Sequence, residues 1–180
     1  VEADKMGGDC LNTGCVPSKA LIKSAKVAEQ MRCADRYGLE PTEPKVPFNR
    51  TIERVMGAIR AIEPNDSVER YEGLGVDVVE GYAKIVDPWR VEITCKDGGV
   101  QRLTTRAIVI AAGADPVIPP IEGLEGSGFL TSDTMWDAFA QMDEPPARVV
   151  VLGGGPIGCE LSQALARLGS QVTQIEMEDR

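Results

Sequence analysis

Residues 148–176 read RVVVLGGGPIGCELSQALARLGSQVTQIE, and this stretch decides the fold class of the chain. An apolar run at 149–152 is followed by a glycine-rich turn, a segment of helical composition, and a second β-branched run that ends at Glu176. Strand, turn, helix and strand in this order within about 30 residues predict a βαβ unit with parallel strands. We therefore expect an α/β fold built on a parallel sheet.

The glycine-rich turn fits the pattern G-x-G-x-x-G and predicts a dinucleotide site. Gly153 allows a tight turn, Gly155 lets the backbone approach a pyrophosphate, and Gly158 lets the helix pack closely on the strand. The start of the helix then presents free N–H groups to the phosphates. The alternative is a glycine-rich loop that binds no ligand. The candidate residues are Gly153, Gly154, Gly155, Pro156, Ile157 and Gly158.

Glu176 ends the second strand of this unit. A carboxylate there can accept hydrogen bonds from the adenosine ribose hydroxyls, and it would repel a 2′-phosphate. The position therefore favours NAD over NADP as the nucleotide. The alternative is that Glu176 is only a polar residue at the end of a strand.

Two helices are expected in the first part of the chain. Apolar residues recur at spacings of three and four from Cys10 to about Ala34, and again from about Asn49 to Tyr71. Pro64 should kink or end the second helix. The prolines within 38–48 indicate a linker between the two helices.

The period changes after residue 75, where short β-branched runs in 76–94 and 100–114 predict a small set of strands. Residues 107–112, AIVIAA, are apolar throughout, as in a strand that is buried on both faces. The segment ADPVIPPIEGLEG that follows is rich in Pro and Gly and is the predicted domain boundary.

Composition excludes several classes of partner. The net charge of −9 argues against nucleic acid and anionic membranes. No stretch approaches the roughly 18–20 apolar residues that span a bilayer. With five cysteines, of which only Cys10 and Cys15 are close in sequence, a redox pair in a reducing compartment is favoured over structural disulfides. We expect a cytoplasmic protein.

Cys10 and Cys15 bracket Leu-Asn-Thr-Gly at the mouth of the first helix. In a regular helix their Cα atoms would lie about 8.6 Å apart, whereas a disulfide needs about 4.4–6.8 Å. The first turn must therefore be distorted, and Gly14 supplies the backbone freedom. A bond formed there would be strained and easily reduced.

Metal binding is the rival interpretation of these cysteines. Zinc sites usually take four Cys or His ligands, and the chain has no His and no second close Cys pair. A plant-type iron–sulfur spacing would need Cys where Ser18 stands. We expect no metal site, and two inert buried thiols remain the alternative to a redox pair. Cys33, Cys95 and Cys159 are interpreted as small core residues.

The segment GGDCLNTGCVPSKAL at 7–21 closely resembles the active-site segment of class I pyridine nucleotide-disulfide oxidoreductases. GYAKIVDP, IVIAAGADPVIPPIEG, LTSDTMWD and GGGPIGCE have counterparts in the same order, so the resemblance covers the whole chain. It is closest to the mercuric reductase-like and dihydrolipoamide dehydrogenase-like branch. It implies three-layer FAD- and NAD(P)-binding domains of Rossmann type, with a small antiparallel β-meander.

The resemblance also implies catalytic roles. Cys15 matches the thiol beside the flavin, and Cys10 matches the interchange thiol that attacks the substrate. Lys19 matches a lysine near the reactive nitrogen of the flavin, and Glu160 matches its carboxylate partner. Without the resemblance, Lys19 and Glu160 would be read as ordinary surface charges.

Further positions match contacts to FAD. Glu2 matches the acid that holds the adenosine ribose of FAD. The remaining matches, besides Lys19, are Gly8, Asp9, Gly81, Ala83, Ala112, Gly113 and Ala114. Departures are an Ala in place of the Thr of the family's Ala-Thr-Gly flavin contact, Asp9 where Thr is commoner, and Pro156 where several relatives carry a gating Tyr.

The resemblance divides the chain into an FAD-binding domain at 1–119, truncated at its start, and the beginning of an NAD-binding domain at 120–180. The dimerisation domain and its His–Glu acid–base pair would lie outside the chain, in a homodimeric parent. The expected enzyme passes electrons from NADH through FAD and the Cys10–Cys15 disulfide to a disulfide or metal-ion substrate. The 180 residues alone are expected to be poorly stable, to be inactive and to hold no FAD. The alternatives are a non-catalytic nucleotide-binding module, and an oxidase or transhydrogenase of the same architecture.

Overall fold

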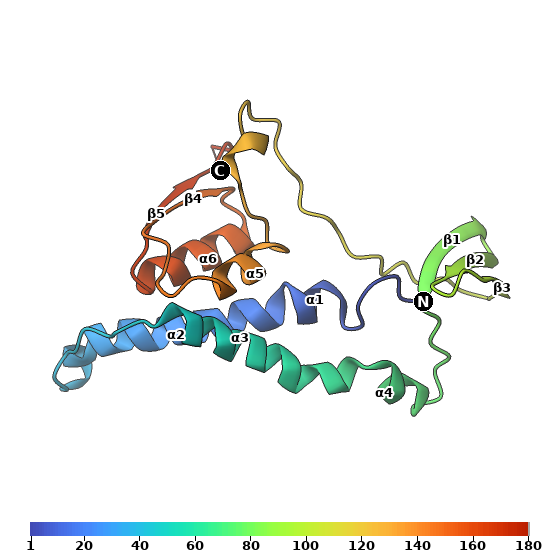
Figure 1. Cartoon of the computed structure of the whole chain (residues 1–180), viewed down its shortest axis with the longest axis horizontal. Coiled ribbons are helices and arrows are strands. Elements are labelled where there is room, and N and C mark those ends of the chain that lie inside the picture. The colour runs from blue at the N-terminus through green and yellow to red at the C-terminus, as the bar shows by residue number, and fades with distance from the viewer. Residues whose placement is uncertain (180) are drawn as a thin grey trace. The chain divides into compact units, whose positions relative to one another are not determined.

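The computed structural model describes residues 1–179, which form two compact units (Figure 1). The first unit contains residues 1–12 and 60–115, and the second contains residues 13–59 and 116–179. The chain therefore changes unit three times, first between Asn12 and Thr13.

The second unit holds the predicted βαβ unit. Strand β4 (Arg148–Leu152) leads through the glycine turn into helix α6 (Pro156–Arg167), and strand β5 (Gln171–Ile175) follows. β4 and β5 pair in parallel, from Arg148 opposite Gln171 to Leu152 opposite Ile175. The prediction of a βαβ unit, and with it the α/β class, is confirmed.

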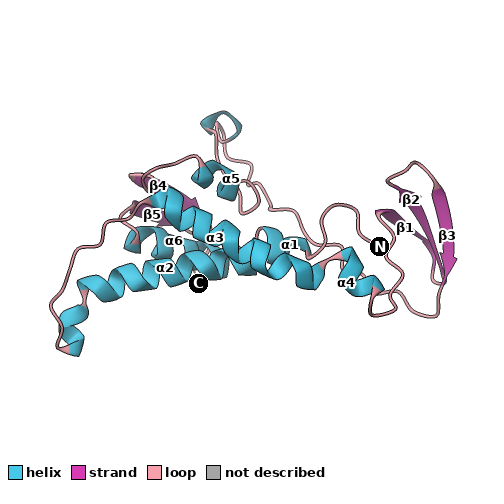
Figure 2. Ribbon diagram, turned by 60° about the horizontal axis from the view of Figure 1, so that its bottom comes forward, coloured by secondary structure: helices cyan, strands magenta, loops and turns pink. Residues whose placement is uncertain are grey.

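Three helices pack on the βαβ unit and form the core of the second compact unit with it. They are α2 (Cys15–Arg32), α3 (Phe48–Ile62) and α5 (Met135–Ala140), and α2 and α3 lie side by side in Figures 1 and 2. Each buries a helical stripe of apolar side chains, which accounts for its stability in the absence of a long sheet. The core residues are Ala20, Leu21, Ala25, Ala28, Phe48, Ile52, Val55, Met135, Trp136, Phe139, Ala164, Leu165 and Leu168.

Polar and aromatic contacts fix the packing of α3. The Arg54 guanidinium donates to the carbonyl of Ala20 in α2 at 2.8 Å. The rings of Phe48 and Phe139 meet edge to face, with centroids 5.4 Å apart. The first contact joins α3 to α2 and the second joins α3 to α5, so together they fix how α3 packs in the core.

Both predicted helices are present, but the first is interrupted at residues 13–14 and does not run unbroken from Cys10. The end that Pro64 predicts for the second helix is confirmed. α3 ends at Ile62, and a short 3₁₀ helix, η2 (Glu63–Asp66), contains Pro64. A second short helix, α4 (Val68–Glu72), begins after Ser67, whose hydroxyl accepts from the N–H of Arg70 at 3.2 Å. Another 3₁₀ helix, η1 (Ala34–Tyr37), closes α2, and residues 40–47 of the linker contain neither helix nor strand.

The first unit contains the predicted antiparallel meander. Its strands are β1 (Gly81–Asp87), β2 (Arg90–Cys95) and β3 (Val100–Thr104), in the order β1-β2-β3 (Figure 2). Glu2 makes a parallel bridge with Glu80, so the start of the chain is tied to the entry of β1. Helix α1 (Gly8–Asn12) completes this unit.

The prediction of a buried strand at 107–112 is wrong. This segment is neither helix nor strand, and Val109 and Ile110 are 88% and 76% exposed. An apolar run forms a strand only where a neighbouring strand pairs with its N–H and C=O groups. Among the described residues, no strand pairs with 107–112. A further 3₁₀ helix, η3 (Glu125–Ser127), lies in the connector that follows.

None of the helices within 1–179 is both long enough and apolar enough to cross a membrane.

Candidate functional site

The glycine turn joins the end of β4 to the start of α6. Gly153 has φ +109°, a conformation that side-chain-bearing residues rarely adopt, and its N–H donates to the carbonyl of Ile175 at 2.8 Å. Gly155 caps α6 in an extended conformation, and Pro156 occupies the first helical position. Proline fits there because its fixed φ suits the helix and its missing N–H would have no intrahelical partner. The local sequence thus ends the strand and starts the helix within a few residues.

Each glycine of the turn meets a different steric demand. A Cβ at Gly158 would collide with the carbonyl oxygen of Gly153. A Cβ at Gly154 would lie 2.6 Å from a carboxylate oxygen of Glu176. A Cβ at Gly155 would meet nothing within 4 Å, so open space adjoins the backbone there. Gly158 thus permits close packing of the helix, Gly154 permits the tight approach of Glu176, and Gly155 leaves the backbone open for a pyrophosphate. The residues of the turn fit a dinucleotide.

Glu176 turns its carboxylate onto this glycine turn. It accepts hydrogen bonds from the N–H groups of Gly154, Met177 and Glu178, at 2.5, 2.6 and 2.9 Å. The bonds from Glu178, Gly154 and Met177 hold the pKa of Glu176 below its ordinary value of 4.5, because they favour the ionised form. An ionised acceptor therefore stands beside the turn, where the ribose of a dinucleotide would need one.

Two further side chains, those of Gln174 and Cys159, bond to carbonyl groups of the turn. The sequence did not single them out for this role. The Gln174 amide donates to the carbonyl of Gly153 at 2.9 Å and to the sulfur of Cys159 at 3.6 Å. The Cys159 thiol donates to the carbonyl of Gly154 at 3.2 Å. The available signal was the position of Gln174 two residues before Glu176, which places both side chains on the same side of β5.

The cysteine segment is interrupted where the spacing predicts distortion. Helix α1 ends at Asn12 and helix α2 begins at Cys15, with Gly14 as its cap at φ −105° and ψ −108°. Cys10 and Cys15 are both exposed. The interpretation as two inert buried thiols is therefore wrong for this structure. That the two sulfurs form a redox pair stays a prediction.

A buried tryptophan anchors the start of α2. The indole N–H of Trp136, which is 3% exposed, donates to the carbonyl of Thr13 at 2.8 Å. Buried indoles usually find such a partner, because an unpaired N–H in the core is costly. The contact holds the residue two positions before Cys15 against the core of the second unit. Sequence reasoning missed it because nothing in the pattern links residues so far apart.

Asp9 meets the end of the 107–114 segment within the first unit. Its carboxylate accepts from the N–H of Ala114 at 3.3 Å, and a Cβ on Gly113, which has φ +71°, would lie 3.2 Å from the same oxygen. The structure therefore brings together Asp9, Gly113 and Ala114, which the resemblance implied as flavin contacts. Gly8 precedes Asp9 in α1, and Ala112 precedes Gly113.

Glu2, Gly81 and Ala83 lie at the edge of the meander. The N–H of Glu2 donates to Val79 at 3.0 Å, and its carbonyl accepts from the N–H of Gly81 at 2.9 Å. Gly81 and Ala83 belong to β1, and a Cβ on Gly81 would collide with the backbone of Thr94. The backbone thus places Glu2 beside Gly81, and the contacts of these residues to FAD stay predictions.

Lys19 lies on α2 and Glu160 on α6, and both are exposed. Among the ion pairs of residues 1–179, none includes either side chain. Their pairing beside a flavin stays a prediction.

The interpretation of the other three cysteines as core residues is wrong. Cys159 is exposed, and Cys33 and Cys95 are half-buried. Cys159 follows the glycine turn directly on the first turn of α6, where the helix face is open to solvent. No group of three or more potential metal ligands gathers anywhere in the described part of the chain.

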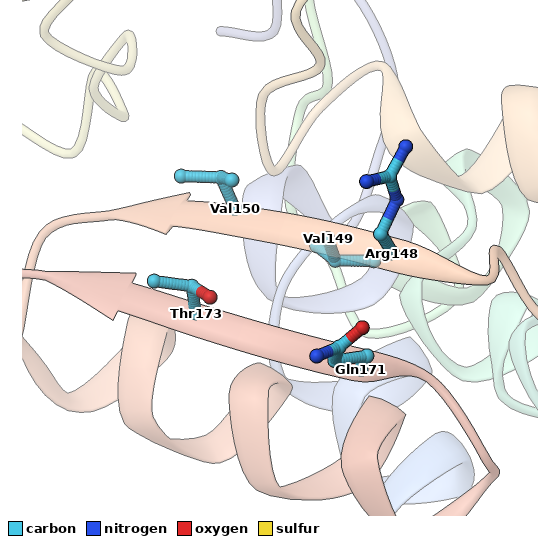
Figure 3. Close-up of a pocket in the computed structure, with 5 residues that line it drawn as sticks. All are labelled: Arg148, Val149, Val150, Gln171 and Thr173. Atoms are coloured by element: carbon cyan, nitrogen blue, oxygen red, sulfur yellow. The ribbon is translucent and has the colours of Figure 1, made fainter.

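A hollow of about 670 Å³ lies on the open face of the β4–β5 sheet (Figure 3). Its walls are formed by Arg148, Val149, Val150, Gln171 and Thr173. Val150 is 63% exposed, so this face carries apolar surface. None of the predicted site residues lines the hollow.

A model of the pyridine nucleotide-disulphide oxidoreductase family matches residues 1–180. The chain belongs to this family. The mercuric reductase of Streptomyces lividans is 36% identical over 177 residues, which are 96% of this chain and 36% of that protein. A dihydrolipoyl dehydrogenase of Bacillus subtilis is 33% identical over 188 residues, covering 100% of this chain and 39% of that protein.

Solved structures of this oxidoreductase family agree with the sequence comparison. LpdA from Mycobacterium tuberculosis matches with a TM-score of 0.79 and 27% identity, over 99% of this chain and 38% of that protein. The Cu(II) complex of RclA from Escherichia coli, an HOCl-induced flavoprotein disulfide reductase, matches with a TM-score of 0.75 and 25% identity. That match covers 99% of this chain and 36% of RclA. The chain thus spans well under half the length of the proteins that it resembles.

Proposed function

We propose that the complete protein is an FAD-dependent oxidoreductase that passes electrons from NADH to the Cys10–Cys15 pair and then to a substrate. The observation that carries the proposal is the interrupted helix start. It exposes two thiols on either side of a break, in a chain that also carries a dinucleotide turn. Membership of the pyridine nucleotide-disulphide oxidoreductase family supports the same conclusion.

The nucleotide would be held by the glycine turn and Glu176. The open backbone at Gly155 and the start of α6 would face the pyrophosphate, and the ionised Glu176 would accept from the adenosine ribose. The same carboxylate would repel a 2′-phosphate, so we propose NAD as the preferred nucleotide. FAD would be held by Glu2, Gly8, Asp9, Lys19, Gly81, Ala83, Ala112, Gly113 and Ala114.

When bound, FAD would supply the route by which an electron pair passes from NADH to sulfur. The chain's own part is the disulfide between Cys10 and Cys15, which takes up two electrons and two protons to become a dithiol. Cys10 then attacks a substrate disulfide, one substrate thiol leaves, and Cys15 closes the bond again as the second thiol leaves. Two electrons enter and two leave in each cycle.

We propose a disulfide or a metal ion as the substrate. The relatives that support these classes carry the names mercuric reductase and dihydrolipoyl dehydrogenase, and RclA was solved as a Cu(II) complex. A thiolate pair suits both, since thiolates exchange with disulfides and bind soft metal ions.

The domain plan of the proposal follows the family resemblance. Residues 1–119 would belong to an FAD-binding domain and 120–180 to an NAD-binding domain, in a cytoplasmic homodimer. The pair that protonates the leaving thiol would come from outside this chain, which contains no His.

Single Cys10→Ser and Cys15→Ser variants of the complete protein test this order of electron flow. Each should reduce substrate turnover by several orders of magnitude, because no dithiol can form, while NADH should still bleach the flavin absorbance. Stopped-flow absorbance with NADH and separate turnover assays measure the two steps. Loss of flavin reduction in both variants, or full turnover in either, would rule the proposal out. If the wild-type protein shows no thiol cycling, it is instead a nucleotide-binding module.

A further inference from the structure

Two carbonyl groups of the glycine turn point to the side where Gln174 and Cys159 lie. The Gly153 carbonyl accepts from the Gln174 amide at 2.9 Å, and the Gly154 carbonyl accepts from the Cys159 thiol at 3.2 Å. The Gln174 amide also donates to the sulfur of Cys159 at 3.6 Å. We call Gln174 and Cys159 the brace of the turn.

The brace depends on the lack of a side chain at Gly158. A Cβ there would lie 3.2 Å from the Gln174 amide nitrogen, besides its collision with the Gly153 carbonyl. The third glycine of the motif therefore leaves room for the amide as well as for the packing of helix on strand. Alternation along β5 puts the Gln174 side chain on this side and that of Thr173 on the other, where Thr173 lines the hollow of Figure 3.

Orientation of these carbonyls matters for an anion. A peptide group that turns its carbonyl toward a pyrophosphate repels it, whereas one that turns its N–H toward the pyrophosphate attracts it. Gly153 has no side chain to restrict its φ, so the turn can sample both orientations at little cost. Donors that engage these two carbonyls hold both peptide groups in one orientation. The N–H of the Gly153–Gly154 peptide then meets the Glu176 carboxylate, and the N–H of the Gly154–Gly155 peptide is left for the ligand.

We propose that Gln174, acting with Cys159, is a positioning residue for dinucleotide binding. This inference rests on the proposed function, because it assumes that the turn binds NAD. Neither side chain needs to touch the nucleotide, since both act through the backbone of Gly153 and Gly154. The thiol of Cys159 acts as a donor, so a residue that keeps a donor at this position should preserve the effect.

The test is NAD⁺ binding to the complete, FAD-loaded protein by isothermal titration calorimetry. Gln174→Leu should raise the Kd for NAD⁺ roughly three- to tenfold, the range expected from the loss of one hydrogen bond. Cys159→Ala should raise it by a smaller factor, and Cys159→Ser, which keeps a donor, should bind NAD⁺ like the wild type. Gln171→Leu is the matched control, because Gln171 lies on the same strand and lines the hollow on the open face.

Steady-state kinetics separate positioning from general damage. Gln174→Leu should raise the KM for NADH by a similar factor and leave kcat unchanged, with flavin content and Tm close to the wild type. Wild-type affinity for NAD⁺ in Gln174→Leu overturns the inference and leaves the proposed function standing. An equal effect in Gln171→Leu, or loss of flavin in Gln174→Leu, also overturns it. A wild-type protein that binds no NAD⁺ overturns the inference together with the nucleotide part of the proposed function.

Discussion

The runs at 107–112 and 149–152 are both apolar and both lead into a glycine, but only the second forms a strand. β4 pairs along its whole length with β5, and its inner side packs on α6. The run at 107–112 pairs with no described strand, and its Val109 and Ile110 face solvent. The difference shows that an apolar run forms a strand through its hydrogen-bonding neighbours, and that its own composition is insufficient.

An aspartate in each run should give the largest contrast. Val149→Asp places a charge on the side of β4 that packs against the core, and we expect it to lower the free energy of unfolding by roughly 3 kcal/mol. Val109→Asp should change it by less than about 0.5 kcal/mol, because Val109 is already exposed. Urea unfolding of the complete protein measures both values. Equal losses would mean that 107–112 is paired with another strand in solution.

Gly155 and Gly158 of the turn after β4 differ in the space beside their backbone, and alanine at each position tests that difference. Gly158→Ala brings a Cβ against the Gly153 carbonyl, so we expect a loss of about 1–3 kcal/mol in unfolding free energy and weaker NAD⁺ binding. Gly155→Ala has open space and an ordinary φ of −67°, so it should fold normally and lose NAD⁺ affinity alone. Thermal melts and calorimetry distinguish the two. A stable Gly158→Ala variant would contradict the packing described for the turn.

Lowering the pH should give the smallest of these effects, a small loss of folding stability at the Glu176 carboxylate. The pKa of Glu176 is lower in the folded chain than its ordinary value of 4.5, so its bonds stabilise the fold above about pH 4.5. That contribution is lost as the pH falls through the lowered value. Glu176→Gln should therefore show a shallower fall of Tm below pH 4.5 than the wild type. Identical pH profiles in the two proteins would show that the carboxylate does not bond the turn in solution.

Local signals in the sequence predicted the elements whose causes are local. Pro64 ends α3, the glycines at 153–158 turn β4 into α6, and the bond expected between Cys10 and Cys15 predicted the break found at Gly14. Each of these depends on residues within one or two turns of the backbone. The family resemblance added Asp9, Gly113 and Ala114, which the structure brings together although they are far apart in the chain.

Contacts between distant segments were beyond the sequence pattern. The bond from Trp136 to the carbonyl of Thr13 involves a backbone atom, which leaves no trace in residue type. The role of Gln174 depends on the side of β5 that faces the turn, and the strand pairing decides that. The exposure of Cys159 was missed for a similar reason. The spacing of apolar residues predicts which face of a helix is apolar, but not which part of that face other elements cover.

Pro156 also reduces the number of amide protons at the start of α6. Proline carries none, the Gly154 proton is taken by Glu176, and the Cys159 N–H already donates to Gly155. The protons left for a phosphate are those of Gly155, Ile157 and Gly158. Deuterium should therefore replace these three quickly in the nucleotide-free protein and slowly once the nucleotide is bound, so that exchange rates report occupancy one amide at a time.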